Sequence, residues 1–473
     1  MHTLCFEWGV YYSFKPLSRG RCISVEAGRV RGMGGSWGPG VEVVDGYAVP
    51  GFVDAHLHLE GLVLAGRGVD VSGAASPEDV YRAVEGGGGG TGIVYARGAP
   101  AWVVESVDPE ALEGAAAAPV ILVSCCGHVA VAGPAAARLA GVNPGIHRGE
   151  GVGALVDAVL STLGCSEALE ALRGLLRLGV TAAGLMDSGS WAASCLSSLL
   201  GREGRLPVRC SLFLSRRHAR RLVDVEGFMP RGAWLRVTGL KLYADGSFSA
   251  CSAAVSTGYA GCRGVGVEAA DPAELRRWVE WGLGRGLMVA VHAIGDVGVE
   301  AALDALEPCP PWSCRVEHCS LSTPRQWRVM ARRGVWAVVQ PGFPVHDAAW
   351  LPERLGARAG ECYRWRGMLE AGVRLAFGSD APVEPADPLW GLDAVASGAP
   401  PLYPGPLLPP REALHAYTAA AAEAAGYRWA GRLLPGYYAD AAVIACDPLE
   451  EWGGLRRCGL TAVLSGGELL SLR

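Results

Sequence analysis

The 473-residue sequence predicts an α/β protein built around a parallel (β/α)8 barrel of the TIM type. Short apolar or β-branched segments recur along the middle of the chain, and amphipathic segments such as "DPAELRRWVEWGLGRG" follow most of them. The expected strands cover residues 50–56, 179–187, 207–214, 237–244, 287–294, 314–319, 334–340 and 372–379. Eight strand–helix units favour a closed barrel over an open sheet.

The two ends of the chain predict a small composite domain. Residues 1–49 contain strand-like pieces such as "CISVEAGRV", and residues 433–473 contain similar pieces such as "GLTAVLSGGELL". Neither end is long enough to bury a core alone. We therefore expect residues 1–49 and 433–473 to combine in one β-sandwich domain.

The segment after the first barrel strand is much longer than a βα loop. The barrel accounts for residues 50–59 and 177–432, which leaves residues 60–176 as an inserted domain. Because this segment leaves the first strand at its carboxyl end, we expect it to lie over the catalytic rim of the barrel. Its alanine, glycine, valine and leucine content predicts an apolar lid over the substrate.

Composition excludes several classes of protein. The net charge is −5, from 42 basic and 47 acidic residues, which excludes the electrostatic footprint of a nucleic-acid-binding protein. The nearly charge-free segment 115–137 contains Pro119, Gly133 and Pro134, so we expect soluble structure there rather than a membrane span. We expect a small-molecule substrate and no nucleic-acid or membrane partner, and we leave a homo-oligomer open.

The cysteines predict the redox state of the protein. There are fifteen of them, an odd number, and no CxxC pair occurs. The N-terminus lacks the basic start and apolar stretch of a signal peptide. We therefore expect a cytoplasmic protein with reduced, mostly buried thiols. Intracellular disulfides, as in hyperthermophiles, are the open alternative.

Metal-binding residue types stand at the ends of the expected strands, where the chemistry of such barrels gathers. The residues are His56 and His58 in "GFVDAHLHL", His292 in "VAVHAIGD", His318 in "RVEHCS" and Asp380 in "AFGSDAPV". The two histidines of the HxH pair alternate along one strand, so both rings project to the same face. Imidazole with carboxylate fits zinc, while iron, manganese, cobalt and nickel are not excluded by ligand type.

A lysine in "GLKLYADGS" completes this set. The basic residues are almost all arginine, and the only lysines are Lys15 and Lys241. Arginine cannot replace lysine where a neutral amine is needed, because the guanidinium stays protonated. Lys241 is therefore a candidate functional residue, and a chance lysine is the alternative.

These motifs together resemble the amidohydrolase superfamily, specifically the amidohydrolase-3 branch that contains N-substituted formamide deformylase. The similar stretches include "VPGFVDAHLHL", "GHVAVAGPAAARLAGV", "GLKLYADGS", "VHAIGD", "RVEHCS" and "YRWRGMLEAGVRLAFGSDAPVEPADPLWGL". They follow the family order from about residue 49 to residue 448. The resemblance therefore covers nearly the whole chain, although it says little about the substrate.

The resemblance implies a binuclear metal site. By similarity, His56, His58 and Asp380 bind the first divalent ion, and His292 and His318 bind the second. Lys241, carboxylated by carbon dioxide, supplies a carbamate that bridges the two ions. His128 and Asp245 are candidate substrate-binding residues, but the segments around both depart from the family pattern. Local hydrogen bonding of a loop is the alternative role for each.

The expected reaction is hydrolysis of a non-peptide C–N bond in an amide or related small substrate. A metal-bound hydroxide would attack, and Asp380 would act as general base and then general acid. The first alternative is a mononuclear deaminase, which usually carries a glutamate a few residues after the fifth-strand histidine, where this chain has Asp296. The second is a non-catalytic barrel used for binding or assembly, which typically loses metal ligands.

Overall fold

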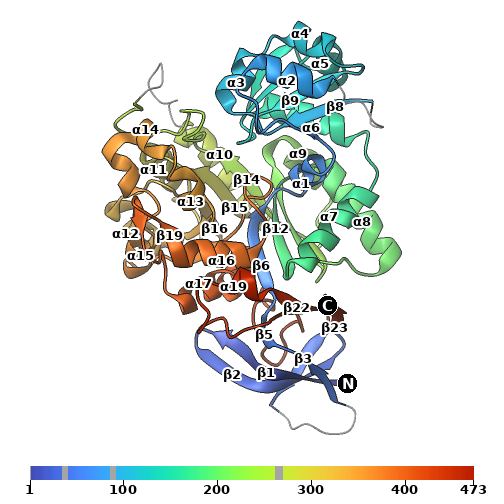
Figure 1. Cartoon of the computed structure of the whole chain (residues 1–473), viewed down its shortest axis with the longest axis vertical. Helices are drawn as coiled ribbons and strands as arrows, with labels where there is room; N and C mark the ends of the chain where they lie inside the picture. The colour runs from blue at the N-terminus through green and yellow to red at the C-terminus, as the bar shows by residue number, and fades with distance from the viewer. Residues whose placement is uncertain (1, 35–40, 86–91, 261–269, 473) are drawn as a thin grey trace.

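The computed structural model describes residues 2–34, 41–85, 92–260 and 270–472. A barrel occupies the middle of the molecule, a β-sheet that contains both chain ends lies at one pole, and the segment after the first barrel strand lies at the other (Figure 1). In these described ranges, no helix combines the length and the apolar character needed to cross a membrane.

Eight parallel strands form the barrel, and each overlaps a strand expected from the sequence, which confirms the barrel prediction. In sheet order they are β6 (Phe52–Leu57), β12 (Val180–Ser188), β13 (Arg209–Ser215), β14 (Leu235–Tyr243), β15 (Met288–Ala293), β16 (Cys314–His318), β17 (Trp336–Val339) and β18 (Leu375–Phe377). Most residues of these strands are buried, as expected for parallel strands covered by helices.

The seam between the first and last strands is closed by individual hydrogen bonds rather than by a ladder. The Asp380 N–H donates to the His56 carbonyl at 2.7 Å, and the His58 N–H donates to the Ala381 carbonyl at 2.8 Å. A Cβ at Gly378 would lie 2.5 Å from the His56 Cβ, so only glycine allows this approach. The seam thus joins the chain segments that carry three candidate metal ligands.

Helices and helical turns accompany the barrel strands, and most of them cover the outside of the barrel (Figure 1). They are α7 (Ser166–Arg177), α8 (Ser190–Glu203), α9 (Arg216–Arg220), η1 (Arg221–Val225), α10 (Pro272–Leu283), α11 (Asp296–Ala305), α12 (Pro324–Arg333), α13 (Phe343–Asp347), α14 (Leu351–Leu355), η2 (Gly356–Glu361), α15 (Trp365–Glu370), α16 (Pro388–Ser397), α17 (Pro410–Ala416), α18 (Ala419–Ala424) and α19 (Leu455–Cys458). A small hairpin, β19 (Gly398–Ala399) with β20 (Tyr403–Pro404), follows α16.

The sequence of α12 shows why these segments form helices. Thr323 and Gln326 make a reciprocal capping box, and proline occupies the first turn. Trp327 and Met330 lie on the buried face, and Gly334 ends the helix in the left-handed conformation. The capping residues at both ends and the apolar face between them therefore specify the same helix.

Both ends of the chain share one sheet. Its strands are β1 (His2–Phe14), β2 (Leu17–Glu26), β3 (Arg29–Met33), β4 (Val41–Val44), β5 (Tyr47–Pro50), β21 (Ala441–Ile444), β22 (Leu460–Ser465) and β23 (Glu468–Ser471). β5 and β21 join the two ends as an antiparallel pair, with Val49 opposite Ala442. The buried ion pair between Arg209 and Asp440, at 2.6 Å, ties this sheet to the barrel.

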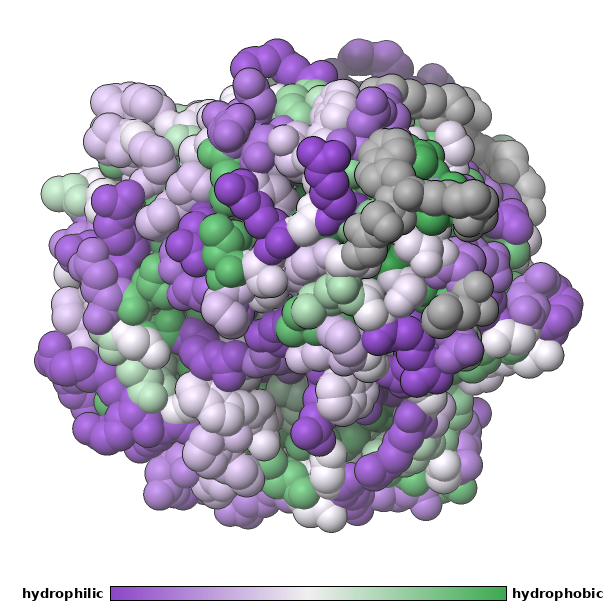
Figure 2. Space-filling view, turned by 90° about the horizontal axis from the view of Figure 1, so that it is seen from below, coloured by the Kyte–Doolittle hydropathy of each residue, from purple (hydrophilic) through white to green (hydrophobic). Residues whose placement is uncertain are grey.

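Seen from the pole that carries this sheet, hydrophilic residues cover most of the visible surface, and hydrophobic residues appear in small scattered groups (Figure 2). The domain boundaries inferred from the sequence, including the division at residues 49 and 433, stay a prediction.

The segment after β6 contains its own α/β layer. Its elements are α1 (Leu59–Ala65), β7 (Val69–Asp70), α2 (Pro77–Val84), β8 (Val94–Arg97), α3 (Ala101–Ser106), α4 (Pro109–Gly114), β9 (Val120–Val123), β10 (Val129–Ala132), α5 (Pro134–Ala140), β11 (Gly145–Arg148) and α6 (Glu150–Leu160). The strand order is β11-β10-β9-β8-β7. Val120 and Leu122 pack on one face of this sheet, and Ile121 and Val123 pack on the other.

This segment contacts the carboxyl ends of the barrel strands. Arg97 donates to the carbonyl of Pro382 in the loop after β18, at 3.4 Å. Arg217, just after β13, pairs with Asp157 of α6 at 2.9 Å. The segment therefore lies against the carboxyl ends of the barrel strands, at the pole opposite the sheet of the two chain ends (Figure 1).

The expectation of reduced thiols is wrong for several cysteines. The structure contains the disulfides Cys5–Cys22, Cys165–Cys195, Cys309–Cys314 and Cys446–Cys458. Cys5 and Cys22 are directly opposite each other on β1 and β2, so the strand register creates this pairing. No cysteine-spacing motif in the sequence predicts it. Cysteine count and spacing could not reveal pairs that only the fold brings together.

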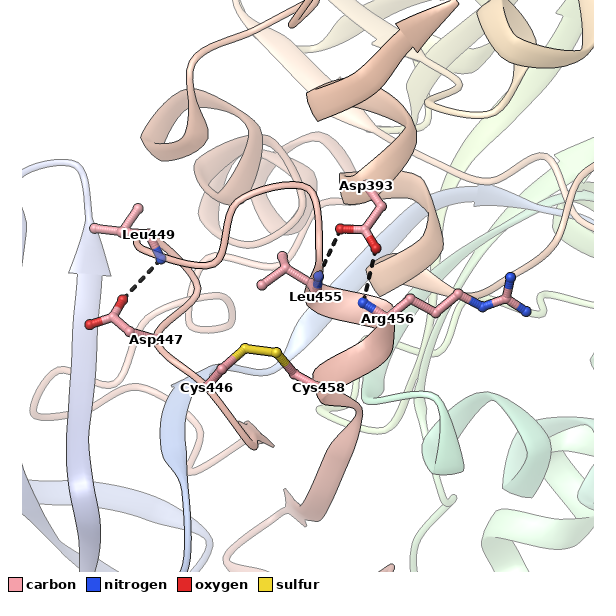
Figure 3. The surroundings of a disulfide bond; sticks show 7 residues. All are labelled: Asp393, Cys446, Asp447, Leu449, Leu455, Arg456 and Cys458. Atoms are coloured by element: carbon pink, nitrogen blue, oxygen red, sulfur yellow. Dashed lines mark hydrogen bonds between the residues drawn. A yellow bond between two sulfur atoms is a disulfide. The ribbon is translucent and has the colours of Figure 1, made fainter.

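One of these disulfides closes the loop between β21 and β22 (Figure 3). Cys446 and Cys458 join its two ends, and the Asp393 carboxylate of α16 accepts the backbone N–H groups of Leu455 at 2.9 Å and Arg456 at 3.0 Å. The loop is therefore fastened both to itself and to a barrel helix.

Candidate metal centre

Three buried side chains at the barrel mouth offer ligand atoms that lie within 4.8 Å of one another: His56, His318 and Asp380. The Nε2 atom of His56 is 3.2 Å from the Asp380 Oδ1 atom, yet it is buried and makes no hydrogen bond to any residue that the structure describes. A buried polar atom without a partner costs free energy. A divalent cation between this imidazole and this carboxylate would satisfy both, so the donor set fits a metal ion.

The HxH pair reaches one carboxylate oxygen. The Nε2 atom of His58 lies 3.1 Å from the same Asp380 Oδ1 atom, and the two imidazole ring centroids are 5.4 Å apart. His58 is partly exposed, whereas His56 is fully buried. The alternation along the strand thus brings both rings to the site, as the sequence predicts.

His292 and His318 stand side by side, with ring centroids 4.4 Å apart. His318 Nδ1 donates to Gln340 Oε1 at 2.9 Å, and His292 Nε2 donates to the Gly246 carbonyl at 2.9 Å. Burial lowers the pKa of His318 to about 3, and burial with the neighbouring His318 lowers the pKa of His292 well below its ordinary value. Both rings are therefore neutral, which is the form that binds metal.

Lys241 is 1 % exposed at the end of β14. Its Nζ atom lies 3.7 Å from Asp187 Oδ2 and 4.7 Å from the centroid of the Tyr243 ring. Tyr243 donates a hydrogen bond to Asp187. Sequence reasoning missed both of these neighbours. Tyr243 is two residues after Lys241 on the same strand, and Asp187 is near the end of β12, so the strand-end criterion could have found them.

Backbone conformations at this rim are unusual. Asp187, His318 and Asp380 have φ values of 53°, 67° and 62°, in the left-handed region that non-glycine residues rarely adopt. Such strain clusters at functional sites, where it aims a side chain. At the end of β16 it allows the consecutive residues Glu317 and His318 both to be buried inside the barrel.

His128 reaches the same region from the inserted segment. Its ring centroid is 5.2 Å from that of His292 and 6.3 Å from that of Tyr243. Both of its ring nitrogens are buried and have no hydrogen-bond partner among the described residues. The inserted segment therefore contributes a polar side chain directly beside the metal candidates.

Asp245 mainly organises loops. Its carboxylate accepts backbone N–H groups from Ala254 at 3.0 Å, Ile294 at 2.9 Å and Gly295 at 2.8 Å. Burial raises its pKa to about 7, and its Oδ1 atom lies 3.6 Å from His292 Nε2. The structure thus shows the local hydrogen bonding that the sequence left as the alternative for this residue.

Comparison with known proteins gives a consistent picture. The sequence model of the Amidohydrolase family matches residues 44–450. An uncharacterized metal-dependent hydrolase from Pyrococcus horikoshii OT3 has a similar structure, with a TM-score of 0.81, 28 % identity, and coverage of 96 % of this chain and 99 % of that chain.

Two curated proteins are also similar. N-substituted formamide deformylase from Arthrobacter pascens is 27 % identical over 508 residues, which cover 91 % of each chain. The putative amidohydrolase YtcJ from Bacillus subtilis (strain 168) is 30 % identical over 258 residues. That alignment spans 52 % of this chain and only 48 % of the length of YtcJ.

Proposed function

Because the chain belongs to the amidohydrolase family, we propose that it is a metal-dependent hydrolase that cleaves a non-peptide C–N bond of a small molecule. The observation that carries this proposal is the convergence of His56, His318 and Asp380 around a buried imidazole nitrogen that has no hydrogen-bond partner within the described part of the chain. The similarity to N-substituted formamide deformylase supports the bond class.

The residues that would hold two divalent ions, with zinc proposed as the metal, are His56, His58, Lys241 as its carbamate, His292, His318 and Asp380. When bound, such ions lower the pKa of water toward neutrality and polarise a carbonyl oxygen. The protein supplies neutral imidazoles and excludes bulk water, because all of these side chains except His58 are buried.

Asp380 is the proposed general base and acid. Burial alone would raise its pKa, but His56 and His58 hold the pKa well below its usual range, so the group is a carboxylate. Its carboxylate would accept the proton of the attacking water and then return that proton to the leaving nitrogen. A carboxylate within hydrogen-bond reach is all that this role requires.

Deamination is the weaker alternative. It would need a carboxylate after the strand-five histidine, and Asp296 occupies that position. Its carboxylate instead accepts the Ser256 N–H at 2.9 Å and pairs with Arg358 at 3.2 Å. Because these neighbours occupy the Asp296 carboxylate, a structural role is favoured for Asp296. A non-catalytic barrel is weaker still, because every candidate ligand is present.

The proposal includes a small-molecule substrate, a cytoplasmic location, no nucleic-acid or membrane partner, and a homo-oligomer as an open possibility. The net charge of −5 supports the absence of nucleic acid. The disulfides agree with a cytoplasmic location only in organisms whose intracellular proteins carry disulfides.

The test is a substrate screen with metal-loaded protein, using formamides, acyl-amino acids, cyclic ureas and lactones. We expect release of an amine from at least one C–N substrate, loss of that activity on chelation, and recovery on added zinc. The variant Asp380→Asn should be inactive. Hydrolysis of lactones alone, or turnover that chelation leaves unchanged, would contradict the proposal.

A further inference from the structure

A buried hydrogen-bonded network of polar side chains lies directly behind the candidate metal centre. His56 Nδ1 donates to Glu317 Oε2 at 2.5 Å, and the Arg315 guanidinium binds both oxygens of the same carboxylate. All three side chains are fully buried. Glu317 stands beside His318 in "RVEHCS" but is not among the predicted site residues.

This network joins two barrel strands across the interior of the barrel. Glu317 and Arg315 alternate on β16, whereas His56 belongs to β6, which is not a neighbour of β16 in the sheet. Arg315 also donates to the carbonyls of Ala55 at 2.7 Å and Ala424 at 2.8 Å. The guanidinium is therefore fixed by backbone on two sides, and it fixes Glu317 in turn.

The Arg315 guanidinium contacts both oxygens of the Glu317 carboxylate, which is the geometry of a charged pair. An anion thus occupies the position behind the His56 ring. The Glu317 carboxylate accepts the hydrogen bond from His56 Nδ1–H and leaves Nε2 facing Asp380. Among the described residues, this Nε2 atom has no hydrogen-bond partner.

The other two buried histidines have different partners. The Nδ1 atom of His318 faces the neutral amide of Gln340. His292 Nε2 faces the Gly246 carbonyl at 2.9 Å, and the Asp245 carboxylate, at 3.6 Å, is already engaged by backbone N–H groups. His56 therefore has the most direct anionic support.

We propose that Glu317 is a positioning residue that holds His56 in the tautomer presenting Nε2 to the metal and so strengthens metal binding at this histidine, with Arg315 holding Glu317 in place. A carboxylate behind a ligating imidazole fixes its orientation and raises its basicity, and loss of such a partner typically weakens metal affinity about 10–100-fold. The inference rests on the proposed function only in requiring that the protein binds metal.

The experiment compares zinc affinity and stoichiometry, measured by competition with a chromophoric chelator, in the wild-type protein and in Glu317→Gln. Glutamine keeps the size of the side chain and removes its charge. We expect about 10–100-fold weaker binding of the most tightly held zinc ion in the variant. Zinc binding is read directly, so no assay of turnover is needed.

A matched control separates metal support from general stability. Asp440→Asn also neutralises one partner of a buried arginine–carboxylate pair, with Arg209, but that pair lies between the barrel and the terminal sheet. We expect both variants to unfold at lower temperature and only Glu317→Gln to bind zinc more weakly. Equal zinc affinity in the wild type and Glu317→Gln, or an equal loss in both variants, would overturn the inference.

A second variant covers the case in which Glu317→Gln does not fold. Glu317→Asp keeps the charge beside Arg315 but withdraws the carboxylate from His56, so its zinc affinity should also fall. Unchanged affinity in this variant would count against the inference. A wild-type protein that binds no metal would refute the proposed function itself, which is a different result.

Discussion

At the scale of single residues, Lys241 is the most informative side chain. It is buried beside Asp187 and the Tyr243 ring, whereas Lys15, the other lysine of the chain, is 42 % exposed in its side chain and pairs with Glu412 at 2.5 Å. One lysine therefore has the surroundings of a functional group, and the other has those of a surface ion pair.

This contrast makes a prediction for conservative replacement. Lys241→Arg should lose at least one metal ion and at least about 100-fold in turnover, because a guanidinium cannot be carboxylated and places a permanent cation beside the ions. Lys15→Arg is the matched control and should keep both properties. Metal analysis and initial rates of the two variants decide the matter, and unchanged values for Lys241→Arg would leave Lys241 without a metal-binding role.

Lys241→Ala should also be inactive, and a short carboxylic acid should partly restore its activity.

His415 makes a prediction for the dependence of stability on pH. Burial, followed by the cations of Lys15 and Arg432, lowers its pKa from 6.5 to about 4 in the folded protein. Below about pH 6.5 the unfolded chain binds a proton that the folded chain does not, so stability falls as the pH decreases toward 4. The contribution is up to about 3 kcal/mol.

The variant His415→Gln lacks this titration and should lose less stability than the wild type between about pH 7 and pH 4.5. The measurement is the free energy of unfolding in denaturant across that range. Replacing the exposed His2 by glutamine gives the control, which should follow the wild type. Parallel curves for His415→Gln and the wild type would show that His415 is not responsible.

Much of the candidate site could be predicted from the sequence, because histidine and aspartate at the ends of predicted barrel strands are a recognisable pattern. His56, His58 and Asp380 are of this kind, and the structure brings them together. Glu317 could not be assigned, since its role depends on a contact across the barrel with a strand 261 positions away. Periodicity describes which face a residue occupies but not which distant strand it meets.

At the scale of elements, the seam between β6 and β18 combines backbone hydrogen bonds with a close glycine contact. The two strands are held by the Asp380–His56 and His58–Ala381 backbone hydrogen bonds rather than by a ladder. Gly378 lies against His56 at this point. The closest approach of the two strands therefore coincides with the candidate ligands.

Gly378→Ala should destabilise the fold and weaken metal binding together. The added Cβ would lie 2.5 Å from the Cβ and backbone nitrogen of His56, and relieving such overpacking costs about 1–3 kcal/mol. The displaced ring should also bind zinc more weakly. Thermal unfolding and zinc titration test both effects.

Gly174→Ala is the control for this substitution. Gly174 lies in α7, where a Cβ would meet nothing within 4 Å, so the change should be neutral or slightly stabilising. If Gly378→Ala behaved like Gly174→Ala, the seam would not be tightly packed.

Element prediction succeeded for the barrel because buried parallel strands and amphipathic helices have clear periods. The eight strands lie where short apolar runs predict them. The disulfides were missed for a different reason. Cys165 and Cys195 belong to the neighbourhoods of α7 and α8, and only the packing of these helices brings the two sulfur atoms together.

At the scale of the whole molecule, the candidate ligands come from the ends of β6, β14, β15 and β16 and from the loop after β18. A bound ion would therefore link strands from around the barrel. Binding to the folded state alone stabilises it, by about 2.7 kcal/mol when the free metal concentration is 100 times the dissociation constant.

Removal of metal should accordingly lower the unfolding temperature of the whole chain. Chelated protein should melt below zinc-loaded protein, and added zinc should restore the difference. A variant with alanine at His56, His318 and Asp380 should show one melting temperature under both conditions. Equal melting of the loaded and chelated wild type would mean that the fold is independent of metal.

The sheet shared by the two chain ends imposes an order on biosynthesis. A ribosome adds about 5–20 residues per second, so β5 exists for on the order of half a minute before its partner β21 is made. β6 waits similarly for β18. During translation the strands of the first fifty residues can pair early, β1 with β2, β4 and β5, and β2 with β3. The other edge of β5 stays unpaired until β21 is made. β5 is thus made early but completes its hydrogen bonds late, and aggregation of nascent chains through its open edge is the hazard that this topology creates.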